Sequence, residues 1–178
     1  MSLVYITGIS GAGKSTVRDE LKRRGFVAYG TDEDSLAAFY NNTTGESVGN
    51  QVAAEVRTVA WRKEHTWKIP RQLIEKIAGE AKDKPIFLCG VAANDNEFWD
   101  LFSHVIALMI DEETLRQRLN ERPDNSFGKL DNELQNTLAW QKTAADDYIQ
   151  LGAVLVDATQ PLNSVVDTIL DIADAKVG

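Results

Sequence analysis

Short apolar runs alternate with amphipathic segments along the whole chain. Five runs rich in aliphatic, β-branched and aromatic residues are bounded by glycine, proline or polar residues, which is typical of short buried strands. The pattern predicts strands over residues 3–7, 26–29, 85–89, 105–110 and 153–156.

Between the strands, apolar residues recur at the three- to four-residue spacing of a helix. Val17 and Leu21 share one such face, and Gly25 ends that segment. Pro70 suits the first turn of another helix, where proline is tolerated. We expect helices over residues 14–24, 34–40, 51–67, from 70 onward, 112–122, 132–151 and 165–175, with a polar loop over 41–49.

This alternation of strands and helices predicts an α/β fold, in which helices cover both faces of a parallel sheet. The crossovers between its strands are expected to be right-handed. Ligands in such sheets bind at the carboxyl ends of the strands. The loops after Ile6, Tyr29 and Cys89 are therefore expected to lie close together.

Composition and charge narrow the range of functions. The 178 residues suit one domain, and the net charge of −8, from 19 basic and 27 acidic residues, argues against binding to nucleic acid polymers or anionic membranes. No stretch approaches the ~20 apolar residues of a transmembrane helix, and the first residues lack the basic segment of a signal peptide. Cys89 is the single cysteine, which excludes an intramolecular disulfide and fits a reducing cytoplasm.

The loop between the first strand and the first helix matches the pattern G-x-x-x-x-G-K-[ST] at every fixed position. Glycines let the backbone curl so that successive N–H groups point at phosphate oxygens, and the positive end of the following helix adds to the same spot. The expected contacts are Lys14 to the β- and γ-phosphates, Ser15 to Mg²⁺ and Thr16 to the α-phosphate. The predicted nucleotide-binding residues are Gly8, Ser10, Gly11, Ala12, Gly13, Lys14, Ser15 and Thr16.

The motif does not say what happens to the γ-phosphate. The chain has no N-K-x-D tetrapeptide, which GTPases use to read guanine, and it is too short for an AAA+ motor with its added helical domain. Asp32 and Asp34 follow the second predicted strand, where a carboxylate can accept the proton of a phosphoryl acceptor or hold Mg²⁺ through water. The alternative is that one of them caps the helix that we expect to run toward Tyr40.

Basic residues cluster after the fourth predicted strand. Arg118 and Arg122 are four residues apart and share one helical face, followed by a polar loop. Guanidinium groups there can bind the phosphate that is being transferred. As part of a lid that closes over the site, they can also exclude water. The alternative is a solvated charged helix in which Glu112, Glu113 and Glu121 are the partners.

With the phosphate loop, the acidic loop and the arginine segment in place, the chain resembles the P-loop kinases that include adenylate kinases, other nucleoside monophosphate kinases and shikimate kinases. The resemblance implies a single three-layer P-loop domain over residues 1–178, with a five-stranded parallel sheet of order 2-3-1-4-5. It also implies an acceptor-binding helical region at about 32–82 and a lid at about 116–131. Arg57, Arg62 and Arg71 fall in that acceptor region.

The chain also departs from these kinases after the third predicted strand. Of the triple glycine of shikimate kinases only Gly90 is present, and the aspartate that many P-loop kinases carry at this strand end is missing, with Asp95 several residues late. Ser15 with Asp32 or Asp34 can then hold Mg²⁺. Asn94 can read the acceptor or cap the next helix.

The function expected from the sequence is an ATP- and Mg²⁺-dependent phosphotransferase, cytoplasmic and either a monomer or a homodimer. Its acceptor is a nucleotide, a nucleoside or another small polar metabolite. Lys14, Asp32, Asp34, Arg118 and Arg122 are the expected catalytic residues, with Ser15 and Asp32 at the metal. An ATP-binding regulatory switch that acts on a protein partner is the alternative.

Overall fold

The computed structural model of the chain describes residues 2–53, 55–82, 84–121 and 131–175. Its centre is a five-stranded parallel sheet with the order β2-β6-β1-β7-β8, which is 2-3-1-4-5 when only the strands of this sheet are counted. The α/β fold and this order were both predicted from the sequence and are confirmed. The strands are β1 (Leu3–Thr7), β2 (Val27–Gly30), β6 (Ile86–Cys89), β7 (His104–Met109) and β8 (Val154–Asp157).

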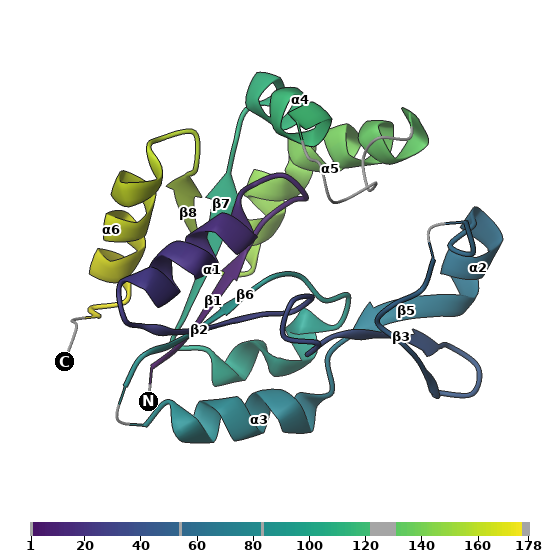
Figure 1. Cartoon of the computed structure of the whole chain (residues 1–178), viewed down its shortest axis with the longest axis horizontal. Helices are drawn as coiled ribbons and strands as arrows, with labels where there is room; N and C mark the ends of the chain where they lie inside the picture. The colour runs from purple at the N-terminus through teal and green to yellow at the C-terminus, as the bar shows by residue number, and fades with distance from the viewer. Residues whose placement is uncertain (1, 54, 83, 122–130, 176–178) are drawn as a thin grey trace.

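Helices cover both faces of this sheet (Figure 1). The helices α1 (Lys14–Arg23) and α6 (Leu162–Ile172) pack together on one face, and α3 (Arg71–Glu80) packs on the other beside the 3-10 helix η1 (Asp95–Leu101). The helices α4 (Glu112–Glu121) and α5 (Asp131–Gln150) lie between β7 and β8 along the chain. Within the described ranges, no helix combines the length and the apolar composition that a membrane span requires.

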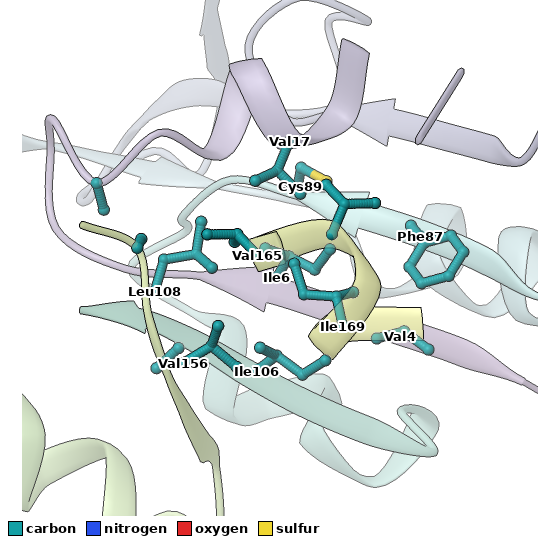
Figure 2. Packing of buried hydrophobic residues seen from close by; sticks show 14 of the residues in the cluster. Val4, Ile6, Val17, Phe87, Cys89, Ile106, Leu108, Val156, Val165 and Ile169 are labelled. Atoms are coloured by element: carbon teal, nitrogen blue, oxygen red, sulfur yellow. The ribbon is translucent and has the colours of Figure 1, made fainter. Parts of the chain in front are cut away.

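Alternate residues of β1 divide the core into two layers. Val4 and Ile6 join the layer that α1 and α6 cover, where Val17 and Ile169 pack beside them (Figure 2). Tyr5 points the opposite way, into the layer under α3 and η1. Every residue of β1 is buried, as expected for a central parallel strand.

The segment between β2 and α3 differs from the sequence prediction. Helices were expected over 34–40 and 51–67, but this segment forms a three-stranded antiparallel sheet of order β4-β3-β5 with one short helix. In Figure 1 this small sheet projects sideways from the main sheet. Its elements are β3 (Ala38–Asn41), β4 (Ser47–Gly49), α2 (Val59–Glu64) and β5 (His65–Lys68).

Aromatic pairing and turn chemistry explain why the small sheet forms. Phe39 on β3 lies directly opposite Trp67 on β5, with ring centroids 4.7 Å apart. The Asn41 side chain accepts hydrogen bonds from the backbone N–H groups of Thr43 and Thr44, which closes the hairpin between β3 and β4. The apolar spacing that suggested a helix over 51–67 is not used for packing, since Val59 is 64% exposed.

Candidate active site

The phosphate loop connects β1 to α1, as its sequence predicts. Gly8 has a φ of +143°, and a Cβ atom there would lie 2.7 Å from the Leu108 carbonyl oxygen on β7. Only glycine allows that approach of the loop to the neighbouring strand. Gly11 and Gly13 also have positive φ angles, of +91° and +100°. The loop therefore has the curled backbone that directs N–H groups toward a phosphate.

The first turn of α1 completes the anion site. Lys14 donates hydrogen bonds from Nζ to the carbonyl oxygens of Gly8 and Ile9, at 2.7 and 2.8 Å, which folds its ammonium group back over the loop. Ser15 and Thr16 are exposed in that turn. Its residues include no acidic side chain, and Gly13 at the N-cap provides no side-chain cap. The first N–H groups of α1 therefore have neither a side-chain cap nor an acidic neighbour in the first turn. Helix N–H groups of this kind favour a bound anion such as a phosphate.

Arg118 of α4 lies against the phosphate loop. Its guanidinium donates to the carbonyl oxygen of Ala12 at 3.2 Å and to that of Ala158, just after β8, at 2.8 Å. The side chain thus joins the two sides of a pocket of about 380 Å³. The pocket is lined by Gly11, Ala12, Gly13, Thr16, Val17, Arg118, Glu121, Ala158, Gln160, Leu162 and Val165.

Arg118 contacts the phosphate loop, whereas Arg116 on the same helix pairs with an acidic residue. Arg116 is exposed and pairs with Glu112 at 2.7 Å, so the solvated-helix alternative fits Arg116 rather than Arg118. Arg122, the second arginine predicted to act in the lid, falls outside the described residues, as does the loop over 123–130. Of the two predicted arginines, the structure therefore places Arg118 beside the phosphate loop.

The acidic loop after β2 is held against α1. Asp34 accepts a hydrogen bond from the Gly30 N–H at 2.7 Å and lies 3.6 Å from the Lys22 ammonium. Asp32 accepts a hydrogen bond from the Thr31 hydroxyl at 2.9 Å, and its carboxylate is exposed. The alternative role as a helix cap is wrong, because residues 31–35 form a turn and no helix follows them before β3.

Two further contacts fix this loop. Glu33 forms an ion pair with Arg18 of α1 at 2.8 Å, and the Arg18 side chain is only 11% exposed. A Cβ atom at Gly30 would lie 2.0 Å from a Glu33 carboxylate oxygen and 2.6 Å from the Arg18 guanidinium, so a side chain there would displace the ion pair. The loop is thereby anchored to the helix that begins with Lys14.

Two of the three arginines expected at the acceptor, Arg62 and Arg71, make contacts within the protein. Arg71 pairs with Glu75 at 2.8 Å and with Asp100 at 2.9 Å, and the hydrogen bonds that it donates to Asp100 and Glu75 raise its pKa above the usual arginine value. Arg62 donates to the Arg57 carbonyl oxygen at 3.1 Å, while Nε of Arg57 is buried with no hydrogen-bond partner among the described residues.

Asn94 has a structural role that the sequence did not reveal. It is buried, accepts from the Ile69 N–H at 3.0 Å and donates to the Ile69 carbonyl oxygen at 2.9 Å. Its side chain makes no capping hydrogen bond to η1. Asn94 therefore ties the segment after β6 to the junction between β5 and α3.

The described residues offer few groups for a metal ion. In the part of the chain that the structure describes, no three His, Cys, Asp or Glu side chains gather as a metal site. The exposed Ser15 hydroxyl and Asp32 carboxylate are oxygen donors, and Mg²⁺ at phosphate sites commonly takes one or two protein oxygens besides the phosphates. This donor set fits Mg²⁺ bound together with a nucleotide.

Comparisons with known proteins identify the type of domain. A family described as an AAA domain matches residues 4–138. The match covers the phosphate loop and most of the main sheet. A search of curated proteins finds no match.

Solved structures share the fold at low sequence identity. Shikimate kinase from Bacteroides thetaiotaomicron is 16% identical, with a TM-score of 0.62 over 97% of this chain and 98% of that one. Shikimate kinase from Acinetobacter baumannii, in complex with shikimate, is 17% identical, with a TM-score of 0.61 over 97% and 92%. A gluconokinase from Sinorhizobium meliloti 1021 is 18% identical, with a TM-score of 0.55 over 97% and 91%. The predicted P-loop kinase fold is confirmed.

Proposed function

We propose, from the premise that this chain belongs to the AAA domain family, that it is an ATP-dependent phosphotransferase that moves the γ-phosphate to a small acceptor. The observation that carries the proposal is the phosphate loop with Lys14 folded over it and Arg118 joining it to the segment after β8. This arrangement suits a bound triphosphate, because amide N–H groups, an ammonium and a guanidinium meet at one place.

Each side chain has a defined part in the transfer. The loop amides and Lys14 hold the β- and γ-phosphates and oppose the charge that builds up on them. Ser15, with Asp32, would hold Mg²⁺, which neutralises phosphate charge when it is bound. Arg118 orients the nucleotide from the side of the pocket beside Gly11 and Ala12. Asp32 and Asp34 orient the acceptor or accept its proton.

The acceptor is proposed to bind between the acidic loop and the small sheet. The acceptor region is proposed at about 32–82, which includes β3, β4 and β5, and the lid at about 116–131, of which residues 122–130 lie outside the described residues. Solved structures with this fold are named shikimate kinase and gluconokinase, which supports a small polar metabolite as acceptor. A nucleotide or nucleoside is the other acceptor class that the P-loop kinase resemblance suggests.

Turnover with a panel of acceptors tests this proposal. Purified protein is incubated with Mg²⁺, γ-labelled ATP and separate samples of shikimate, gluconate, nucleosides and nucleoside monophosphates. Transfer of label to one class is expected, and Lys14→Ala should remove both transfer and calorimetric ATP binding. Hydrolysis without transfer for every acceptor, together with a protein partner that binds only in the presence of ATP, would instead favour a regulatory switch.

A further inference from the structure

Four polar side chains meet at the carboxyl end of β1, next to the phosphate loop. They are Tyr5 and Thr7 of β1, Asp95 at the start of η1, and Tyr148 of α5. The Tyr5 hydroxyl lies 3.5 Å from the Asp95 carboxylate, and Thr7 immediately precedes Gly8 of the phosphate loop. Three segments that are distant in sequence thus bring a carboxyl group and three hydroxyl groups to the edge of the sheet where ligands bind.

The surroundings of these groups are apolar. The Tyr5 side chain is fully buried, and its ring stacks on Phe102 at 4.8 Å. Burial, and then the Asp95 charge, raises the pKa of Tyr5 well above the usual tyrosine value. Burial also raises the pKa of Tyr148, and the Asp95 charge contributes to that shift as well. The hydroxyl groups of both tyrosines are therefore neutral beside Asp95.

The Asp95 carboxyl group is partly buried and only loosely held. Burial raises its pKa above the usual aspartate value, whereas hydrogen bonds from the Asn96 N–H and the Tyr5 hydroxyl act in the opposite direction and lower it. The 3.5 Å contact with Tyr5 is at the long limit of a hydrogen bond. Asp34, in contrast, accepts a 2.7 Å bond from the Gly30 N–H and lies beside Lys22. Asp95 therefore keeps more of its accepting capacity for a ligand than Asp34 does.

The buried hydroxyl group of Thr7 is a second, independent observation that indicates a ligand site at this cluster. Its side chain is 1% exposed, and although its hydroxyl lies near Tyr5 and Tyr148, no described group makes a hydrogen bond of normal geometry with it. Burying a hydroxyl without a partner costs free energy, so such a group in a folded protein calls for an explanation. A site for a polar ligand at the same edge of the sheet supplies one.

The charge of the cluster indicates which ligands fit. Among the described residues, the groups that act on the Asp95 pKa include no lysine or arginine. Arg71, the predicted acceptor residue that is nearest in sequence to Asp95, pairs with Glu75 and Asp100 instead. A carboxylate without a cation beside it repels a phosphate group and attracts a hydroxyl donor.

We propose that Asp95 binds the acceptor by accepting a hydrogen bond from one of its hydroxyl groups, and that Tyr5, Thr7 and Tyr148 position the Asp95 carboxylate. This inference rests on the proposed phosphotransferase function and narrows its acceptor to a hydroxylated metabolite that presents no phosphate group at this point. Asp95 contacts the substrate, whereas the three hydroxyl residues act through Asp95.

Steady-state kinetics of matched variants tests the proposal, with the best acceptor of the panel as the probe. Asp95→Asn should raise KM for the acceptor about 10- to 100-fold, the range for a hydrogen bond to a charged group, and leave KM for ATP unchanged. Asp100→Asn is the control, because it makes the same change on the same 3-10 helix at an exposed residue that pairs with Arg71. Tyr5→Phe should change the acidic limb of kcat/KM for the acceptor while the aromatic packing is kept.

A measurement on the wild-type protein covers the case in which Asp95→Asn fails to fold. With ¹³C-labelled aspartate, the Asp95 carboxyl resonance should shift when the acceptor is added beside a non-hydrolysable ATP analogue. Among the described residues, the groups that face this carboxyl are Tyr5 from β1, Tyr148 from α5, and the Asn96 N–H from η1.

The outcomes separate the two proposals. If the wild type transfers phosphate but Asp95→Asn keeps the wild-type KM for the acceptor, the role of Asp95 is refuted and the phosphotransferase stands. An unmoved Asp95 resonance, or transfer to the phosphate group of a nucleoside monophosphate as the preferred reaction, also refutes it. If the wild type phosphorylates no acceptor, the proposed function fails first, and the role of Asp95 fails with it.

Discussion

The Arg118 guanidinium donates a hydrogen bond to the Ala158 carbonyl oxygen at 2.8 Å and so joins α4 to the segment that follows β8. The same group contacts the carbonyl oxygen of Ala12 in the phosphate loop at 3.2 Å. Three segments that are far apart in sequence therefore meet at one cation. This cation lines the pocket that also includes Thr16 and Gln160.

Removing the Arg118 side chain should weaken nucleotide binding. Arg118→Ala takes away a cation and the bridge across the pocket, so we expect Kd for ATP to rise about tenfold, which is a loss of about 1.4 kcal/mol. Isothermal calorimetry measures this change directly. Arg116→Ala is the matched control, because Arg116 is on the same helix but exposed and paired with Glu112. Equal effects of the two substitutions would contradict the role assigned to Arg118.

Gly90 should tolerate no side chain. Its φ is +155°, and an added Cβ atom would lie 2.0 Å from the Thr31 hydroxyl oxygen. We expect Gly90→Ala to lower the free energy of unfolding by more than about 2 kcal/mol in urea denaturation. Gly79→Ala is the control, since this position in α3 has open space around it and alanine should stabilise the helix by about 0.5–1 kcal/mol. A Gly90→Ala protein as stable as the wild type would show that Gly90, which follows β6, does not pack closely against Thr31, which follows β2.

Glu20 should make stability depend on pH in acid. Hydrogen bonds from Arg23 and Arg24 lower the pKa of this carboxyl group from 4.5 to about 2. The stabilisation is therefore complete above about pH 4.5 and is lost as the pH falls toward about 2. Glu20→Gln should reduce the slope of unfolding free energy against pH in that window. The two proteins should converge below the window, where both are uncharged at position 20, and an unchanged slope would contradict the pairing.

Cys89 should react with thiol reagents only after unfolding. The thiol is 3% exposed, and burial raises its pKa far above the usual cysteine value. Because the thiolate is the reactive form, Ellman's reagent should label the native protein negligibly and the urea-unfolded protein fully. Rapid labelling of the native protein would show that the layer between the main sheet and α1 opens readily.

Local patterns in the sequence predicted the main sheet and the phosphate loop. The phosphate loop is a single continuous segment, so its backbone shape and the place of Lys14 follow from neighbouring residues. The expected five strands agree with the structure because each is a continuous apolar run. Arg118, which the sequence predicted to act on the phosphates, lies beside the phosphate loop, since α4 begins directly after β7.

Contacts between distant segments explain what the sequence did not predict. The strands β3 and β5 form through pairing between Phe39 and Trp67, which are 28 positions apart, and no local periodicity reports such a pairing. The pairing of Arg71 with Asp100 likewise depends on how α3 packs on η1. Tyr5 and Asp95 are 90 positions apart, so the only signal in the sequence was an aspartate that follows β6 later than expected.

Phosphorus NMR of a reaction mixture tests the central claim most directly. With ATP, Mg²⁺ and the acceptor chosen from the panel, we expect a phosphate monoester resonance to grow as the γ-phosphate resonance of ATP falls. The same mixture with Lys14→Ala should show neither change. Growth of inorganic phosphate alone, in equal amounts with and without the acceptor, would contradict the assignment of this chain as a phosphotransferase.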